Sequence, residues 1–465
     1  MKFLYQSTLS LVLIMASHTI EAKSINIEHG YSPSQLQVNT RLSQTKLVQH
    51  ASNTVFLDIT FAPPEISNIQ KQQRATDIII ILDKSGSMSE AKKMPYAKAA
   101  IWDVLGRLNQ NDRFALVSFS DNAIVQSPLV NVSNATRSYL NNIVSSIRAS
   151  GGTNIGAGLN TALNLLEDRN SERAKKILLL SDGQANQGIT NPQQLALIAA
   201  KATHYGAVLS TIGMGLGFNE TLMAKLADYG MGHYSYLEDL SGLSTILARD
   251  LNDTRNIYAN SSTLEINLTD GVKLIDAGGY PITQQGNSAK INIATGQMLS
   301  NTQKHFVMTF NVPTHNIADF SLGKLQLNYQ VKGEQLHYQI KPQQLVLTVV
   351  APEQKIQAQK SIDKEIYQKS WVENNLGRMK KKLSQWMREG KKDKAKNEIA
   401  KYRKEMKDAA SVSNIPLASI KMDEQLSEME EQIEEAFVGK AMDQQVKRNR
   451  AAKSMQYDSI KKQRN

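Results

Sequence analysis

Apolar residues recur at every second position in two separate regions of the chain, residues 23–75 and 256–352, as in the segment 55–61. This alternation is typical of antiparallel strands with one buried face. In the second region, the dipeptide Lys332-Gly333 separates two alternating segments, which predicts a β-hairpin. The two regions therefore predict two parts of one antiparallel β-sandwich.

A different pattern fills residues 76–255, which lie between the two sandwich regions. Short continuous apolar runs alternate there with amphipathic segments of helical period, and the runs occupy residues 77–82, 114–119, 177–181 and 207–213. Buried strands that alternate with helices indicate a doubly wound, mostly parallel α/β sheet of Rossmann-like type. We predict that this α/β domain is inserted into the sandwich, because strands of sandwich type precede and follow it.

Residues 353–443 show a third pattern, with apolar residues at alternating spacings of four and three. This spacing predicts charged helices of coiled-coil type. The earlier helices are rich in Lys and the last is rich in Glu, so a self-packed hairpin or bundle is expected, with docking to another protein as the alternative. Residues 444–465 are basic and have little apolar periodicity, which predicts a frayed or disordered tail.

The chain begins with features of a secretory signal peptide over residues 1–22. Lys2 supplies a positive start, a mostly apolar stretch follows, and small residues near Ala16 and Ala22 offer cleavage points. The alternative is a buried N-terminal helix. The signal predicts an exported protein that is periplasmic, secreted or attached to the cell surface. No later stretch is long and apolar enough to predict a transmembrane segment in the mature chain.

The cysteine content and the distribution of charge exclude some classes of site and partner. The absence of cysteine excludes disulfides and thiolate metal sites. The formal net charge is +11, and residues 353–465 hold 26 Lys and Arg against 18 Asp and Glu, a net of +8, whereas the rest of the chain has 28 against 25, a net of +3. A basic exported tail could contact envelope proteins or an anionic surface, or could simply be a solvated helical surface. The tail lacks an aromatic or Gly-rich RNA-binding pattern, which argues against nucleic acid.

Polar side chains follow two of the buried strands and one Gly-rich turn. Asp83, Ser85 and Ser87 come at the end of the run 77–82, Thr153 lies in "SGGTNIGAGL", and Asp182 ends the run 177–181. Ligands of open α/β sheets bind beyond the carboxyl ends of the strands. Each feature also has a simpler interpretation, since Ser or Thr before a helix is commonly an N-cap and Asp-Gly is commonly a turn. Their combination on strand ends favours one common site.

This set resembles the metal-ion-dependent adhesion site of the von Willebrand factor A (VWA) domain, whose motif is Asp-x-Ser-x-Ser followed by Thr and then Asp. The resemblance covers residues 76–255 and implies five metal ligands, Asp83, Ser85, Ser87, Thr153 and Asp182. It implies direct coordination by the two serine hydroxyls, and direct or water-mediated coordination by the threonine and the aspartates. The order of domains also looks like that of exported bacterial A-domain or inter-α-inhibitor-like proteins and, more loosely, of calcium-activated chloride channel regulators, whose His-Glu-x-x-His signature is absent here.

The chemistry of these side chains can be argued without the family. An all-oxygen set of two carboxylates and three hydroxyls suits a hard cation, Mg²⁺ first, with Mn²⁺ next and Ca²⁺ fitting less well. Neutral hydroxyl ligands leave the ion Lewis-acidic, so a Glu or Asp of a protein ligand could complete its coordination shell. Residues adjacent to the ligands are expected to form the ligand-binding rim: Met88, Gly152, Asn154, Gly183 and Gln184.

Enzymatic activity has little support in the sequence. The histidines are scattered, and the motifs His-Glu-x-x-His, Gly-x-Ser-x-Gly and Gly-x4-Gly-Lys-[Ser/Thr] are absent. The Gly-rich segment 213–218 lacks phosphate-loop spacing and predicts a strand-to-helix turn. We therefore expect a non-enzymatic binding protein that engages an acidic residue of a protein ligand through Mg²⁺. The alternatives are an envelope assembly scaffold that uses the basic tail and, by analogy alone, a regulator of an ion transporter.

Overall fold

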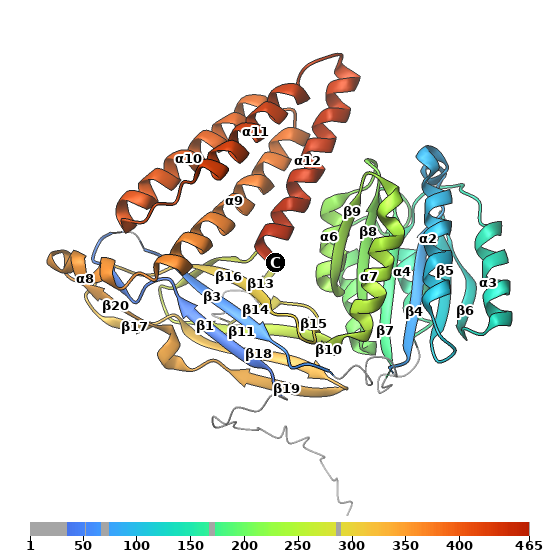
Figure 1. Cartoon of the computed structure of the whole chain (residues 1–465), viewed down its shortest axis with the longest axis horizontal. Coiled ribbons are helices and arrows are strands. Elements are labelled where there is room, and N and C mark those ends of the chain that lie inside the picture. Colours follow the sequence, from blue (N-terminus) through green and yellow to red (C-terminus); the bar gives the residue numbers. More distant parts are fainter. Residues whose placement is uncertain (1–34, 52, 67–73, 167–172, 285–289, 465) are drawn as a thin grey trace, which may run out of the picture. The chain divides into compact units, whose positions relative to one another are not determined.

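The computed structural model describes residues 35–51, 53–66, 74–166, 173–284 and 290–464 (Figure 1). The predicted signal peptide lies outside these residues. Within the described ranges, no helix has both the length and the hydropathy needed to cross a membrane.

The inserted α/β domain is built on a six-stranded sheet in the order β6-β5-β4-β7-β8-β9, in which every neighbouring pair is parallel except β5 and β6. Its strands are β4 (Thr76–Asp83), β5 (Arg113–Phe119), β6 (Ala123–Asn131), β7 (Ala174–Ser181), β8 (Ala207–Met214) and β9 (Met231–Leu237). The chain leaves β4 toward β5 on one side and returns to β7 on the other. The carboxyl end of β4 is therefore the topological switch point, where ligands of such sheets bind.

Helices cover both faces of this sheet (Figure 1). They are α2 (Lys93–Arg107), α3 (Asn134–Ser146), α4 (Ile155–Leu163), α5 (Pro192–Ala200), α6 (Glu220–Tyr229) and α7 (Leu243–Arg255), with short 3-10 segments at Gly86–Lys92, Lys201–Tyr205 and Leu240–Gly242. Alternate residues of β4 supply the two cores. Ile78 and Ile80 pack in the core of α2, α3 and α7, whereas Ile79 and Ile81 pack in the core of α4, α5 and α6. A strand buried on both faces explains the continuous apolar run.

Strands from both sides of this domain form the β-sandwich, as the sequence predicts. One sheet has the order β1-β3-β16-β12 and another has β13-β14-β11-β18-β19, and both contribute to a single core. The strands are β1 (Gln37–Leu42), β3 (Thr54–Ala62), β11 (Ser261–Leu268), β12 (Lys273–Ala277), β13 (Ile282–Gln284), β14 (Lys290–Ala294), β16 (Lys304–Asn311), β18 (Gly323–Val331) and β19 (Glu334–Gln339). β3 pairs along its length with β16, which joins residues 54–61 to residues 304–311 across the insertion. The hairpin predicted at Lys332-Gly333 connects β18 and β19.

Two smaller sheets complete the strand content of the described residues. One has the order β17-β20-β2 and the other pairs β10 with β15. Their strands are β2 (Lys46–Val48), β10 (Ile257–Ala259), β15 (Met298–Leu299), β17 (Asp319–Ser321) and β20 (Val346–Val350), and short 3-10 turns lie at Pro342–Leu345 and Pro352–Gln354. The predicted fold class, a doubly wound α/β domain inserted into an antiparallel sandwich and followed by a helical region, is confirmed.

The C-terminal region is helical, with α8 (Lys355–Lys360), α9 (Lys364–Arg388), α10 (Lys392–Ser413), α11 (Ile420–Ala436) and α12 (Ala441–Arg464). The apolar positions of α9, α10 and α11 share one core with Phe56 and Val307 of the sandwich. The Lys-rich and Glu-rich faces pair as expected, because Lys396 contacts Glu434 at 2.6 Å and Arg403 contacts Glu430 at 2.5 Å. The helices therefore pack on one another and on the sandwich.

The expectation of a frayed tail at 444–465 is wrong. Helix α12 packs against α9, and the hydroxyl of Ser459 donates to the carbonyl of Gly377 at 2.7 Å. Its buried residues include Lys453, whose ammonium contacts Glu220 of the α/β domain at 2.7 Å. Much of the buried side of α12 is polar and pairs with other polar groups, so the helix lacks the apolar period that would have revealed it in the sequence.

Candidate functional site

The predicted side chains meet at the carboxyl ends of β4 and β7. The hydroxyl of Ser87 donates to Oδ1 of Asp182 at 2.9 Å, and the hydroxyls of Ser85 and Ser87 lie 3.2 Å apart. The backbone N–H of Ser85 donates to Oδ1 of Asp83 at 2.8 Å. Residues that are 95 positions apart in the chain are thus joined in one hydrogen-bonded group, because β4 and β7 are neighbouring parallel strands.

Asp83 is the most buried member of the group, with no exposed surface. Its Oδ2 accepts a hydrogen bond of 2.5 Å from Ser181, the last residue of β7. Burial raises the pKa of the Asp83 carboxyl to about 6, against the opposing effect of the hydrogen bonds from Ser181 and Ser85. An ionised carboxylate without contact to water is stabilised by a neighbouring cation.

Thr153 reaches the same place from the Gly-rich turn before α4. Its side chain is buried, and its hydroxyl makes no hydrogen bond within the described part of the chain. A Cβ added at Gly183 would lie 2.9 Å from the Thr153 hydroxyl and 3.5 Å from Oδ2 of Asp83. Gly183 therefore keeps open a space that oxygens of both residues border, as a bound cation would require.

The simpler interpretation, in which these hydroxyls are helix caps, does not hold. Ser85 is the N-cap of the 3-10 segment Gly86–Lys92, yet its side chain makes no capping hydrogen bond. At α4 the cap is Asn154, whose side-chain oxygen accepts from the N–H of Ala157 at 3.0 Å. The hydroxyls of Ser85, Ser87 and Thr153 are consequently available for another role.

Five oxygen-bearing side chains therefore surround this strand end, two of them carboxylates, and this donor set fits a hard divalent cation. Nucleophilic chemistry would need a base beside a serine. Among the described residues, the hydroxyl of Ser87 contacts only the hydroxyl of Ser85 and the carboxylate of Asp182. The geometry suits ion binding better than activation of a serine.

The predicted rim residues differ in their exposure to solvent. The side chain of Met88 is fully buried in the core beneath α2, so its placement on the rim is wrong. Met88 was placed on the rim because it follows Ser87 in the chain, but the 3-10 segment Gly86–Lys92 turns its side chain inward. Gln184 is exposed, whereas Gly152, Asn154 and Gly183 are partly exposed, and they stay candidates for contact with a ligand.

Sequence reasoning missed several residues that hold the group together. Ser181 binds Asp83, and Lys93 binds Asp182 with its Nζ 2.5 Å from Oδ2. Asp121 accepts from the N–H of Gly152 at 2.9 Å, and Asn186 accepts from the N–H of Thr153 at 2.8 Å. Ser181 had a usable signal, since it is the final residue of a buried strand and precedes a predicted ligand.

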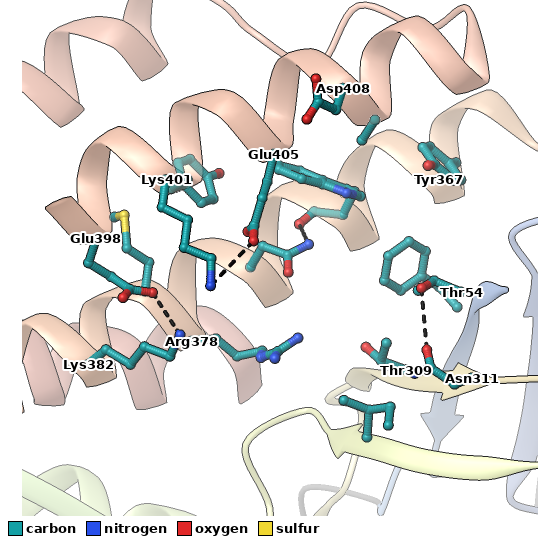
Figure 2. Close-up of a pocket in the computed structure, with 17 residues that line it drawn as sticks. Thr54, Thr309, Asn311, Tyr367, Arg378, Lys382, Glu398, Lys401, Glu405 and Asp408 are labelled. Atoms are coloured by element: carbon teal, nitrogen blue, oxygen red, sulfur yellow. Dashed lines mark hydrogen bonds and ion pairs between the residues drawn. The ribbon is translucent and has the colours of Figure 1, made fainter. Parts of the chain in front are cut away.

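A separate cavity of about 470 Å³ lies between α9, α10 and the sheet of β3, β12 and β16 (Figure 2). Lys382 of α9 lies 2.7 Å from Glu398 of α10, and Lys401 lies 3.7 Å from Glu405 one turn along α10. This cavity contains none of the predicted ligands and is not part of the site at the strand ends.

The raised pKa of Asp83 predicts a pH dependence of the metal-free protein. Because the folded-state pKa is about 6 and the ordinary value is 3.8, the folded state binds this proton more tightly, and ionised Asp83 costs stability as pH rises through this window. We expect Asp83→Asn to be about as stable as the wild type at pH 4, and roughly 2–3 kcal/mol more stable above pH 7. Urea unfolding in EDTA across this range measures the difference, and a difference that does not change with pH would contradict the assignment.

Comparison with known proteins places the central domain in a family. Residues 77–249 match the model of the von Willebrand factor type A domain. The Escherichia coli protein YfbK is 30% identical over 179 residues, which cover 38% of this chain and 31% of that protein. The bovine inter-alpha-trypsin inhibitor heavy chain H4 is 34% identical over 179 residues, 36% of this chain and 18% of that protein. The matches thus span less than a third of these relatives.

Solved structures resemble the chain over nearly its full length. A von Willebrand factor type A protein from Catenulispora acidiphila has a TM-score of 0.65 at 17% identity, covering 89% of this chain and 93% of that chain. The ArnB paralog VWA2 from Sulfolobus acidocaldarius has a TM-score of 0.52 at 17% identity, covering 91% and 99%. At this identity the likeness concerns the fold. No enzyme family is indicated, and VWA domains are generally non-enzymatic binding modules for proteins. The chain therefore contains a von Willebrand factor type A domain at residues 77–249.

Proposed function

We propose that this chain is an exported, non-enzymatic protein that binds an acidic residue of a protein ligand through a Mg²⁺ ion at its VWA domain. The observation that carries the proposal is the convergence of Asp83, Ser85, Ser87 and Asp182 in one hydrogen-bonded group at the switch point. Export is inferred from the signal-like residues 1–22.

The ligand set would be Asp83, Ser85, Ser87, Thr153 and Asp182, and VWA domains often bind a divalent metal at such a motif. A bound Mg²⁺ would supply a Lewis-acidic position that a carboxylate of the protein ligand can fill. The two aspartates balance the charge of the ion, and the three hydroxyls bind it without adding charge. Gly152, Asn154, Gly183 and Gln184, which lie within two residues of Thr153 or Asp182 in the chain, would shape the choice of ligand. Mn²⁺ could replace Mg²⁺, because it also favours oxygen ligands.

A scaffold that recruits envelope proteins through its helical tail has less support. The apolar stripes of α9, α10 and α11 are buried inside this chain and are not free to pair with another protein. The tail would then offer mainly its charged outer surface. Binding of a protein ligand at the VWA site is better supported than the scaffold, because the side chains it needs already lie together at the ends of β4 and β7.

A pull-down from envelope fractions tests the proposal. The wild-type chain is expected to retain a protein in Mg²⁺ and to lose it in EDTA, and Asp83→Ala should retain none because it lacks a ligand carboxylate. Ser89→Ala is the matched control, since Ser89 is exposed on the same turn and its hydroxyl donates to the carbonyl of Gly86 rather than to a member of the ligand set. Amidation of carboxylates in the fraction should abolish retention. Retention that survives both EDTA and Asp83→Ala would refute the proposal.

A further inference from the structure

A lysine occupies the innermost side of the proposed metal site. The Nζ of Lys93 lies 2.5 Å from Oδ2 of Asp182 and 3.2 Å from the carbonyl oxygen of Ser87. The pair is almost dry, since the Lys93 side chain is 9% exposed and that of Asp182 is not exposed. Asp182 thus uses one oxygen for the hydroxyl of Ser87 and the other for an ammonium group.

The backbone before α2 is distorted in a way that directs this lysine inward. Glu90 leaves the helical region, and Ala91 and Lys92 have positive φ values of 48° and 56°. Two consecutive non-glycine residues in the left-handed region are unfavourable and persist only where the surroundings impose them. The turn begins α2 at Lys93, which is buried, and leaves the neighbouring Lys92 exposed.

The loop after β8 leaves room for the lysine stem. A Cβ added at Gly215, whose φ is 73°, would lie 3.2 Å from Cε of Lys93. Gly217 of the same loop passes close to the carbonyl oxygen of Asp182, since a Cβ added there would lie 2.9 Å from it. The strand ends of β4, β7 and β8 therefore enclose the ion pair.

We propose that Lys93 is a built-in counter-cation that keeps Oδ2 of Asp182 away from the metal and sets the charge of the loaded site. This inference rests on the proposed function. Two carboxylates balance a divalent ion, and Lys93 leaves the loaded site one positive charge in excess. That excess weakens binding of the metal and strengthens binding of an anionic ligand. The lysine therefore raises the affinity of the loaded site for a carboxylate of the protein ligand and lowers its affinity for the metal.

Titration of Mg²⁺ into the metal-free full-length protein tests the first half of this inference. Lys93→Met, which keeps the apolar stem and removes the charge, is expected to bind Mg²⁺ about ten-fold or more tightly than the wild type. Lys92→Met, the exposed neighbour, should bind like the wild type. If the wild type binds Mg²⁺ and Lys93→Met binds it no more tightly, the inference is wrong while the proposed function stands. No binding by the wild type would overturn both.

The pull-down in saturating Mg²⁺ tests the second half. Lys93→Met should retain less of the captured protein although it holds the metal more tightly. A lysine with only a structural role would also weaken capture but would weaken metal binding with it, and that result overturns the inference. If Lys93→Met does not fold in EDTA, Mg²⁺ is expected to restore its circular dichroism spectrum, because the ion replaces the lost positive charge. Failure to refold at Mg²⁺ levels that saturate the wild type contradicts the inference.

Discussion

Replacing Asp250 with alanine is expected to lower the free energy of unfolding by about 3–5 kcal/mol. Asp250 lies on α7, and its Oδ1 is 2.9 Å from Nζ of Lys176 in the middle of β7. The Lys176 side chain is fully buried, and that of Asp250 is 4% exposed. Removing the carboxylate leaves an ammonium in the domain core without its counter-ion. Nearby His233 cannot replace the carboxylate, because an imidazole carries no negative charge at neutral pH; burial, followed by the charge of Lys176, lowers its pKa to about 4 and keeps it neutral.

Urea unfolding monitored by circular dichroism measures this loss. Asp103→Ala is the matched control, because Asp103 forms a partly exposed pair with Arg107 one turn away on α2, and its loss should cost about 0.5 kcal/mol or less. Adding Lys176→Met to Asp250→Ala should recover much of the stability, since no unpaired charge remains. Equal, small losses for Asp250→Ala and Asp103→Ala would show that the pair is not buried as described.

Asp83→Ala is expected to lower the affinity for Mg²⁺ by about 100-fold or more, because removing residues that merely support metal ligands already costs about 10–100-fold. Asp83 would be one of two carboxylates in the set. Its hydrogen-bond partners are the N–H of Ser85 and the hydroxyl of Ser181, neither of which can replace a carboxylate. The fold should survive, since ionised Asp83 destabilises the metal-free protein, as its raised pKa indicates. Loss of binding would then reflect the site alone.

Isothermal titration calorimetry with graded variants checks this result. Ser181→Ala removes the hydroxyl that orients Asp83 and should weaken Mg²⁺ binding by about 10-fold or more. Ser89→Ala should leave binding unchanged, since this hydroxyl donates to the carbonyl of Gly86 rather than to a member of the ligand set. Wild-type affinity in Asp83→Ala would contradict the assignment of Asp83 as a ligand.

The architecture could be predicted from the sequence where burial sets a simple period. Residues 78–82 are apolar on both faces because β4 lies between two helical layers, and β3 alternates because the sandwich has one shared core. The shared alternation of the two flanking regions predicted one common sandwich, whereas the pairing of β3 with β16 across the insertion came from the structure. Helix α12 was not predicted because its buried side carries Lys453, Ser459 and other polar residues. Lys453 and Ser459 each have a hydrogen-bond partner in another element.

Within the candidate site, the motif residues could be read from the sequence because they follow strand ends in a fixed order. Lys93 could not, since its burial depends on left-handed residues at Ala91 and Lys92, where nothing in the side chains signals such a turn. Met88 was misplaced because adjacency to Ser87 in the chain does not say which way a side chain points, and the 3-10 segment turns this one into the core. Conformations that tertiary packing imposes on ordinary residues leave no local pattern.

A crystal structure of the full chain grown with Mn²⁺, with anomalous diffraction measured at the manganese edge, would show whether a metal ion binds at the ends of β4 and β7. We expect a peak bordered by the hydroxyls of Ser85, Ser87 and Thr153, with the ammonium of Lys93 still on Asp182. Mn²⁺ takes the oxygen ligands that Mg²⁺ prefers, and its anomalous signal identifies the ion without ambiguity. A well-ordered site without a peak in saturating Mn²⁺, or a peak elsewhere only, would contradict the proposed metal site.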